Sequence, residues 1–338
     1  MNKLAQALSI ILTIASCSII AQYRNVRISD ALNNYEPQEC MIVISPDNPN
    51  HLMAVSNSNK YYYSTDGGNN WSYNIIQSPL GVIGDPVAAA GNNGKFFYFH
   101  LVSGLSKVVC HKLTNIGGSW NQVAYTGENG TKQNDKEWGV INPINNYLYV
   151  AWAQFDRHGS SNYSDSSAII LSRSTNEGTS WSQPVLISRK KGNAQGGNYS
   201  AHCPMPAVGP NNNVYVTWMG PDGLMFDKST DGGVTWLTYD INVAKYHVDW
   251  LLFNISGIQR APNFPAINCD LSKSIYRGNI YITWADQKNG GYNTDVWICR
   301  STDGGTTWNT PKVVNETVND PGSHQFKTNH IPANKPQL

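Results

Sequence analysis

One eight-residue pattern recurs along this chain and constrains its fold more than any other feature. Close copies of Ser-x-Asp-Gly-Gly-x-x-Trp occupy residues 64–71, 229–236 and 301–308, a looser copy occupies 174–181, and a degraded one ends at Gly117-Gly118-Ser119-Trp120. Asp-Gly-Gly provides positive-φ positions without steric cost, and the Asp carboxylate can accept hydrogen bonds from amides of its own turn. The Trp ring can then pack against the strands that the turn joins. We therefore expect the octet to be the hairpin of a repeated β unit.

Five modules with a common order of segments surround these octets. Each opens with a short, usually Pro-containing segment, at Glu36-Pro37, Asp85-Pro86, Asp135, His202-Cys203-Pro204 and Ala261–Pro265. A strand of alternating apolar and β-branched residues follows an Asn/Gly turn, at 51–55, 96–102, 147–152, 214–218 and 280–284. Such period-two alternation, without helical periodicity, indicates strands throughout. Repeats of about 50–70 residues with four strands each are typical of β-propeller blades. The chain is therefore predicted to be an all-β propeller.

The octet resembles the Asp box, or BNR repeat, of the sialidase (neuraminidase) superfamily, and the chain is similar to exo-α-sialidases over nearly all its length. The resemblance implies a six-bladed propeller, here spanning residues 22–326, with the boxes on the blade periphery. Five modules are complete, and His324-Gln325-Phe326 looks like the opening of a truncated sixth, before an irregular tail at 327–338. A five-bladed ring closed by a strand at 25–29 is the alternative.

The N-terminal residues 1–21 have the features of a secretory signal peptide. Lys3 precedes an apolar run at 8–20, and Ala21 is a small residue suited to cleavage. The segment 14–17 resembles a lipobox that would place a lipid anchor on Cys17, but the apolar run continues beyond it, which favours simple secretion. The protein is predicted to be secreted or at the cell surface, with no transmembrane segment.

Composition excludes several partners. The chain has 24 basic and 23 acidic residues, so neither nucleic acid nor an anionic membrane is an expected partner. The five cysteines after residue 21 are scattered, with no spacing that implies a zinc site or a disulfide framework. No loop has a calcium-ligand spacing, so we expect neither a metal nor another cofactor. The resemblance implies a glycan or glycoprotein ligand.

The resemblance also implies an axial site in which three arginines bind the substrate carboxylate, a Tyr assisted by a Glu is the nucleophile, and an Asp is the acid/base. The first family arginine lies in an Arg-Ile-Pro segment before the first inner strand. Here that place is Glu36-Pro37-Gln38-Glu39, and no arginine triad can be assembled. An axis lined by carboxylates would repel the carboxylate of a sialic acid.

The candidate site residues are those at the module openings, which a propeller brings to one axial face. They are Asp85, Asp135, Glu137 and Arg260 as catalytic residues, with His202 and Trp138 as substrate-binding residues. Two carboxylates there could act as acid and base in glycoside cleavage. Polar residues before a strand could instead cap it, and Trp138 could belong to the blade core. Asp156-Arg157-His158 is expected to form salt bridges within its loop.

Three functional hypotheses follow from these observations. The first is a secreted, sialidase-like glycoside hydrolase acting on sialylated or other glycans. The alternatives are a non-catalytic propeller that binds glycans or proteins, and a truncated fragment of a larger cell-surface protein.

Overall fold

The computed structural model describes residues 25–29, 38–57, 59–195, 199–246, 264–289 and 294–315, and the structural statements that follow concern these residues. The predicted leader 1–21, Arg260, the opening at 324–326 and the tail 327–338 lie outside the described residues. Within them, no helix is long and apolar enough to span a membrane.

The described chain forms five antiparallel sheets, each built on four strands in sequence order, with a fifth short strand added to the third sheet. The first contains β1 (Met41–Ile44), β2 (Leu52–Ser56), β3 (Lys60–Ser64) and β4 (Ser72–Ile75). The second contains β5 (Gly84–Ala90), β6 (Phe96–Leu101), β7 (Val108–Leu113) and β8 (Trp120–Thr126). The third contains β9 (Gln133–Ile141), β10 (Leu148–Phe155), β11 (Ser166–Ser174) and β12 (Val185–Leu186), with β13 (Gly192–Asn193) also paired to β11. The fourth contains β14 (His202–Val208), β15 (Val214–Gly220), β16 (Gly223–Ser229) and β17 (Ile241–Ala244), and the fifth contains β18 (Ala266–Cys269), β19 (Ile280–Asp286), β20 (Asp295–Ser301) and β21 (Lys312–Val313).

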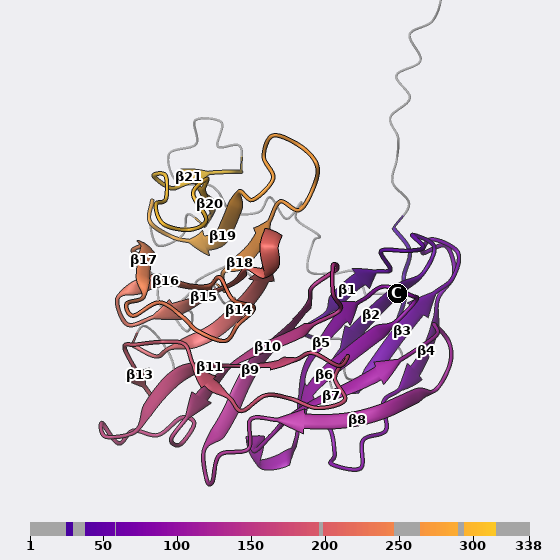
Figure 1. The fold of residues 1–338 in the computed structure, drawn as a ribbon. Coiled ribbons are helices and arrows are strands. Elements are labelled where there is room, and N and C mark those ends of the chain that lie inside the picture. The colour runs from indigo at the N-terminus through magenta and orange to yellow at the C-terminus, as the bar shows by residue number, and fades with distance from the viewer. Residues whose placement is uncertain are drawn as a thin grey trace, which may run out of the picture.

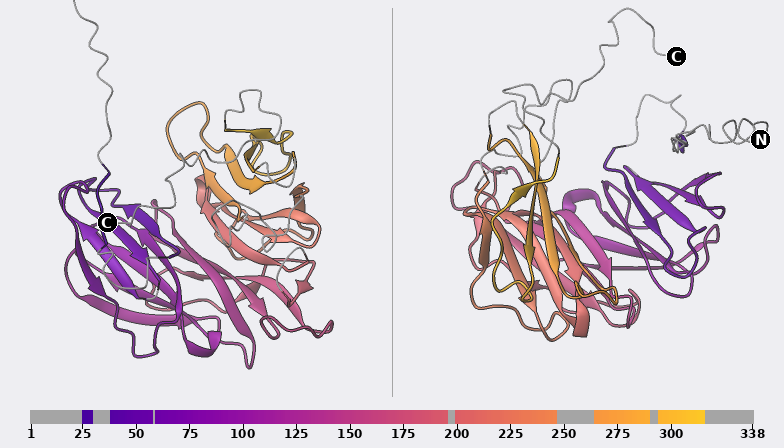
Figure 2. Two further views of the ribbon diagram at one scale, coloured as in Figure 1. Left: turned by 180° about the vertical axis from the view of Figure 1, so that it is seen from behind. Right: turned by 90° about the horizontal axis from the view of Figure 1, so that it is seen from above.

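The five sheets follow one another around an arc. The first strands of successive sheets are neighbours, β1 with β5, β5 with β9, β9 with β14 and β14 with β18, so these strands line the inside of the arc. The first and fifth sheets lie apart at its two ends (Figure 1), and the view from behind shows the same separation (Figure 2). The prediction of an all-β propeller with five complete modules is confirmed. Residues 25–29 belong to no strand, so the alternative of a ring closed by that segment is wrong.

The middle sheets are apolar on both faces because each packs between two others. Every residue of β10 and of β15 is buried, including Trp152 and Trp218, which have no exposed surface. Between the second and third sheets, Phe97 and Phe99 pack with Val150 and Trp152. The strand sequences are nearly continuous apolar runs for this reason, in contrast to a sheet with one wet face.

The octets form the connections between the third and fourth strands, as the sequence predicted for a hairpin. In the fourth sheet the Ser229 hydroxyl donates to Asp231 Oδ1 (2.7 Å) and accepts from the Gly233 amide (2.8 Å), while the Thr235 amide donates to Asp231 Oδ1 (2.9 Å). The first and fifth sheets repeat these bonds. In the looser copy Asn176 takes the place of the Asp and makes the same contacts.

The second glycine of an octet is also a packing site. In the fifth sheet Gly305 lies against the Phe226 ring of the preceding sheet, and in the fourth sheet Gly233 lies against the Tyr149 ring of the third. Both glycines have positive φ. The position therefore needs glycine for its backbone conformation and for the close approach of the neighbouring sheet.

Alanine substitutions at Gly305 and Gly68 separate these two requirements. Their φ angles are 82° and 88°, so either alanine meets a similar backbone strain. A Cβ at Gly305 would overlap the Phe226 ring, whereas at Gly68 the nearest atom belongs to Trp71 of the same octet, 3.7 Å away. We expect Gly305→Ala to lower the free energy of unfolding by about 1–3 kcal/mol more than Gly68→Ala, measured by urea titration. Equal losses would show that the octet does not dock on the neighbouring sheet.

Candidate functional site

The first strands of four sheets share an unusual backbone feature near their starts. A non-glycine residue there adopts positive φ: Glu39 (53°), Asp85 (54°), Lys136 (48°) and Cys203 (55°). In β5, β9 and β14 the pairing with the second strand shifts register at this point, which is the mark of a β-bulge. Positive φ is unfavourable for these residue types, so four repetitions on one end of the propeller indicate a functional constraint.

The bulge in β9 directs three consecutive charged side chains to three different places. Asp135 contacts the fourth sheet through His202, and Lys136 reaches residues of the first and second sheets. Glu137 points into the protein and is 1% exposed. A regular strand would have placed Asp135 and Glu137 on one face and Lys136 on the other.

Lys136 joins two carboxyl groups from different sheets. Its Nζ lies 2.7 Å from Glu39 Oε1 and 3.2 Å from Asp85 Oδ1, and Glu39 and Asp85 also hydrogen-bond each other. Asn57 holds the backbone beneath them, because its Oδ1 accepts from the Asp85 amide at 2.8 Å.

Glu39 and Asp85 have shifted pKa values in opposite directions. Burial, followed by the hydrogen bond with Glu39, raises the pKa of Asp85 to about 7. Burial alone would also raise the pKa of Glu39, but the hydrogen bond from Asp85 and the charge of Lys136 outweigh it and lower that pKa. Below about pH 7 the shared proton therefore resides mainly on Asp85, which donates to the Glu39 carboxylate.

Asp135 is held by two histidines. Its Oδ2 accepts from His202 Nε2 at 2.8 Å and lies 3.4 Å from His158 Nε2. Burial would raise the pKa of Asp135, but the hydrogen bonds from His158 and His202 lower it well below its usual range. The same bond to Asp135 raises the pKa of His158. The rings of Phe155 and Phe264 meet the His202 ring edge-on and limit its movement.

Glu137 lies beneath this cluster rather than in it. Both of its carboxyl oxygens are buried without a hydrogen-bond partner in the described part of the chain. Burial, together with the charge of Asp85, raises the pKa of Glu137 well above its usual value, so its surroundings favour the neutral acid over the carboxylate. A side chain that is 1% exposed has no direct access to a substrate.

The structure thus brings together three of the six candidates named from the sequence, Asp85, Asp135 and His202. Trp138 is half-buried and packs against the apolar cluster of the second and third sheets. Arg260 lies outside the described residues. The carboxylates do line the axial side, as expected, but Lys136 contacts Glu39 and Asp85, two histidines contact Asp135, and no described arginine contacts any of them.

Sequence reasoning missed three members of the cluster: Glu39, Lys136 and His158. Glu39 occupies the same positive-φ position as Asp85, so an alignment of the first two modules could have found it. Lys136 reaches the axis only because of the bulge, which the sequence does not reveal. The salt bridges predicted within the loop 156–158 do not form: Asp156 pairs with Lys132 of the link before β9 at 2.8 Å, and His158 contacts Asp135.

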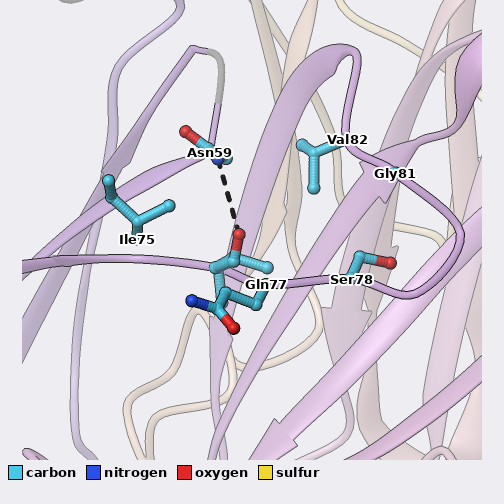
Figure 3. A pocket seen from close by; sticks show the side chains of 7 residues that line it. Asn59, Ile75, Gln77, Ser78, Gly81 and Val82 are labelled. Carbon is cyan, nitrogen blue, oxygen red and sulfur yellow. Dashed lines mark hydrogen bonds between the residues drawn. The ribbon is translucent and has the colours of Figure 1, made fainter.

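A shallow hollow lies at the same end of the first sheet, where β4 ends and the chain passes to β5. It has a volume of about 320 Å³ and is lined by Asn59, Ile75, Ile76, Gln77, Ser78, Gly81 and Val82 (Figure 3). Asn59 Nδ2 donates to the Ile76 carbonyl at 3.5 Å across it. The lining contains no ionisable side chain. The groups suited to acid–base chemistry lie instead in the axial cluster, which consists of Glu39, Asp85, Asp135, Lys136, His158 and His202. Among the described residues no group of three or more His, Cys, Asp and Glu side chains could hold a metal ion.

Comparison with known proteins shows which solved structures have a similar fold. No family model matches the chain, and no curated protein matches it. Among solved structures, the α-L-arabinofuranosidase Arb93A from Fusarium graminearum is 16% identical, with 85% of this chain and 84% of that one covered and a TM-score of 0.53. An α-L-arabinanase from Penicillium chrysogenum is 14% identical over 80% of this chain and 79% of that one (TM-score 0.47). The NanB sialidase from Streptococcus pneumoniae is 9% identical over 78% and 67% (TM-score 0.47). The likeness to the arabinofuranosidase, together with the five four-stranded sheets, shows a propeller fold of the kind found in that glycosidase.

Glu137→Gln is expected to change how stability depends on pH. Because folding raises the pKa of Glu137, its contribution to stability is fully present below its unfolded pKa of about 4.3 and is lost as the pH rises towards the folded pKa. Over that interval the wild-type free energy of unfolding falls by about 1.4 kcal/mol per pH unit through this group, and the glutamine variant lacks that loss.

Urea titrations at pH 5, 6 and 7 measure this difference. Glu128→Gln is the control, because Glu128 is an exposed partner of Lys107. Parallel pH profiles for the wild type and Glu137→Gln would mean that Glu137 ionises freely in the folded protein.

Proposed function

We propose that this protein is a glycoside hydrolase that uses the axial cluster to cleave glycans outside the cell. The observation that carries the proposal is the pair of carboxyl groups, Asp85 and Asp135, whose surroundings push their pKa values in opposite directions. Glycoside cleavage needs one protonated and one ionised carboxyl group at the same pH. The predicted leader at 1–21 is the basis for an extracellular site of action.

Asp85 is the proton donor in this proposal. Its pKa of about 7 leaves it protonated in neutral or mildly acidic solution, so that it can protonate the glycosidic oxygen of the leaving group. Lys136 and Glu39 hold the group in place. When the proton leaves, Lys136 at 3.2 Å stabilises the resulting Asp85 carboxylate.

Asp135 is the base that activates water. His202 and His158 keep its carboxylate ionised and fix its orientation, since both contact the same oxygen, Oδ2. Oδ1 is then the atom that can accept a proton from water. His158 is partly exposed, so protons can pass between Asp135 and the solvent through this side chain.

The substrate class in this proposal is glycans in general, with sialosides as one member to be tested. Lys136 is the lysine of this cluster that could attract an anionic sugar, but two carboxyl groups already contact it. A sugar without a carboxylate needs no arginine clamp, which makes neutral glycosides the better match to the described cluster.

A non-catalytic glycan-binding propeller is the second candidate. The observation that favours it is that Asp135 Oδ2 and Asp85 Oδ1 are both already engaged by cationic or histidine partners. Such fully paired groups form a rigid polar surface, which suits binding to sugar hydroxyls.

Hydrolysis of a panel of chromogenic sialosides, arabinofuranosides, xylosides and hexosides tests the proposal. We expect turnover of at least one member, and a loss of about 100-fold or more in kcat for Asp85→Asn and for Asp135→Asn. Asp222→Asn is the matched control, because Asp222 is an exposed carboxylate paired with Lys190. Because Asp85 acts in its protonated form, kcat should fall as the pH rises above about 7.

Folded protein that cleaves no member of the panel would contradict the hydrolase proposal. Binding on a glycan array that Asp85→Asn and Asp135→Asn both abolish would then support the binding candidate.

A further inference from the structure

Two tyrosine side chains lie in the solvent on the segments that carry the histidines of the axial cluster. Tyr163 is 94% exposed and lies in the loop between β10 and β11, five residues after His158. Tyr199 is 67% exposed and precedes His202, the first residue of β14, by three residues. A single exposed ring needs no explanation. Two rings on the two segments that hold Asp135 indicate a common role.

The two segments are hydrogen-bonded to each other. The Gly159 amide of the loop donates to the Ala194 carbonyl at 2.8 Å. The Asn193 amide donates to the Tyr199 carbonyl at 2.7 Å, and β13, which ends at Asn193, pairs with the start of β11. The loop that carries Tyr163 and the backbone of Tyr199 are therefore both anchored to the third sheet.

The loop around Tyr163 is also held by its own polar side chains. Ser160 Oγ donates to Asp165 Oδ2 at 2.5 Å, and the Asn162 amide donates to Ser160 Oγ at 3.2 Å. The Ser164 amide donates to Asn162 Oδ1 at 3.1 Å. A ring that a fixed loop already holds out in the solvent loses less conformational freedom when a ligand binds to it.

Both rings are within reach of a glycan bound at the axial cluster. Three residues of chain span at most about 11 Å and five residues about 18 Å, which limits how far Tyr199 lies from His202 and Tyr163 from His158. The two histidines meet at Asp135 Oδ2. Tyrosine has an apolar ring face, on which the C–H face of a sugar can pack, and a hydroxyl that can hydrogen-bond a sugar hydroxyl. A few linked sugar rings cover the distance from Asp135 to either tyrosine.

We propose that Tyr163 and Tyr199 form an aromatic binding site for sugar rings that extend from the axial cluster over the third sheet, so that the natural ligand is an oligosaccharide or polysaccharide. This inference deepens the proposed function and rests on its premise that the axial cluster binds a glycan. The two tyrosines bind and orient the chain and take no part in the chemical step. A single glycoside that occupies the axial cluster alone does not reach them.

Native affinity electrophoresis of the full chain measures this binding separately from turnover. The gels contain arabinan, xylan, β-glucan or mucin. We expect at least one polymer to retard the protein, and Tyr163→Ala and Tyr199→Ala each to raise the dissociation constant about 3- to 10-fold. Tyr163→Phe should retain most of the affinity, because it keeps the ring.

Tyr239→Ala is the matched control and should leave the retardation unchanged. Tyr239 is 80% exposed and follows the octet 229–236, which lies at the other end of the fourth sheet from His202. The Tyr163 ring is almost wholly in the solvent, so Tyr163→Ala should keep the Tm of the wild type. Its loss of affinity then reports the missing ring, even if Tyr199→Ala does not fold.

Kinetics give a second readout where one of these polymers is cleaved. Tyr163→Ala should raise KM several-fold for oligosaccharides released from that polymer and leave kcat unchanged, because the ring does not touch the reacting groups. Turnover of the chromogenic glycosides of a single sugar should not change.

The outcomes distinguish this inference from the hydrolase proposal. Tyrosine-dependent retardation of a protein that cleaves no glycoside would support the aromatic site and contradict the hydrolase. Retardation or cleavage of a polymer that neither alanine variant weakens would overturn the aromatic site, and the cleavage would still support the hydrolase. A protein that no polymer retards would also overturn the aromatic site.

Discussion

A β-sheet that is apolar on both faces is stable only when another layer covers each face, and the three middle sheets of this protein are of that kind. Strands such as β10 and β15, buried along their whole length, have no polar side to turn to water. Burying a large apolar side chain contributes about 1.5–3 kcal/mol. The sheets therefore have to stack side by side, and the curvature of the arc follows from that stacking.

The octets allow this stacking because they satisfy backbone amides of their own turns. Each hairpin satisfies its own amides through one Ser hydroxyl and one Asp or Asn side chain, so the turn can lie against a neighbouring sheet. The glycines at its tip leave room for an aromatic ring of that neighbour, as at Gly305 and Phe226. Side chains just before the octets also reach the octet of the next sheet: Lys112 contacts Glu177, Arg173 donates to the Gly232 carbonyl and Lys228 donates to the Gly304 carbonyl.

The axial cluster is built at the other end of the first strands, where the backbone departs from regular β geometry. Three carboxyl groups close to one another would repel if all were ionised and unpaired. Here Lys136 lies between Glu39 and Asp85, a proton remains on Asp85, and two histidines hold Asp135. The result is a set of groups with different protonation states at one pH, which is the property that the proposed function uses.

The fold was largely predictable from the sequence, and the site only in part. Octet spacing and strand alternation depend on local rules of turn and strand geometry, so they correctly gave the propeller class, five complete modules and the place of the hairpins. They also placed Asp85, Asp135 and His202 at the openings of their modules, and a propeller brings the module openings to one axial face. The partners of these residues were not predictable.

Lys136 faces Glu39 and Asp85 because of a bulge, and His158 reaches Asp135 from a loop. The burial that raises the pKa of Glu137 depends on the sheet packed against it. The sequence by itself thus determined the repeat, its hairpins and the residues that approach the axis. The tertiary structure alone decided which charges meet and which protons they keep, since those depend on distances between segments that are far apart in the chain.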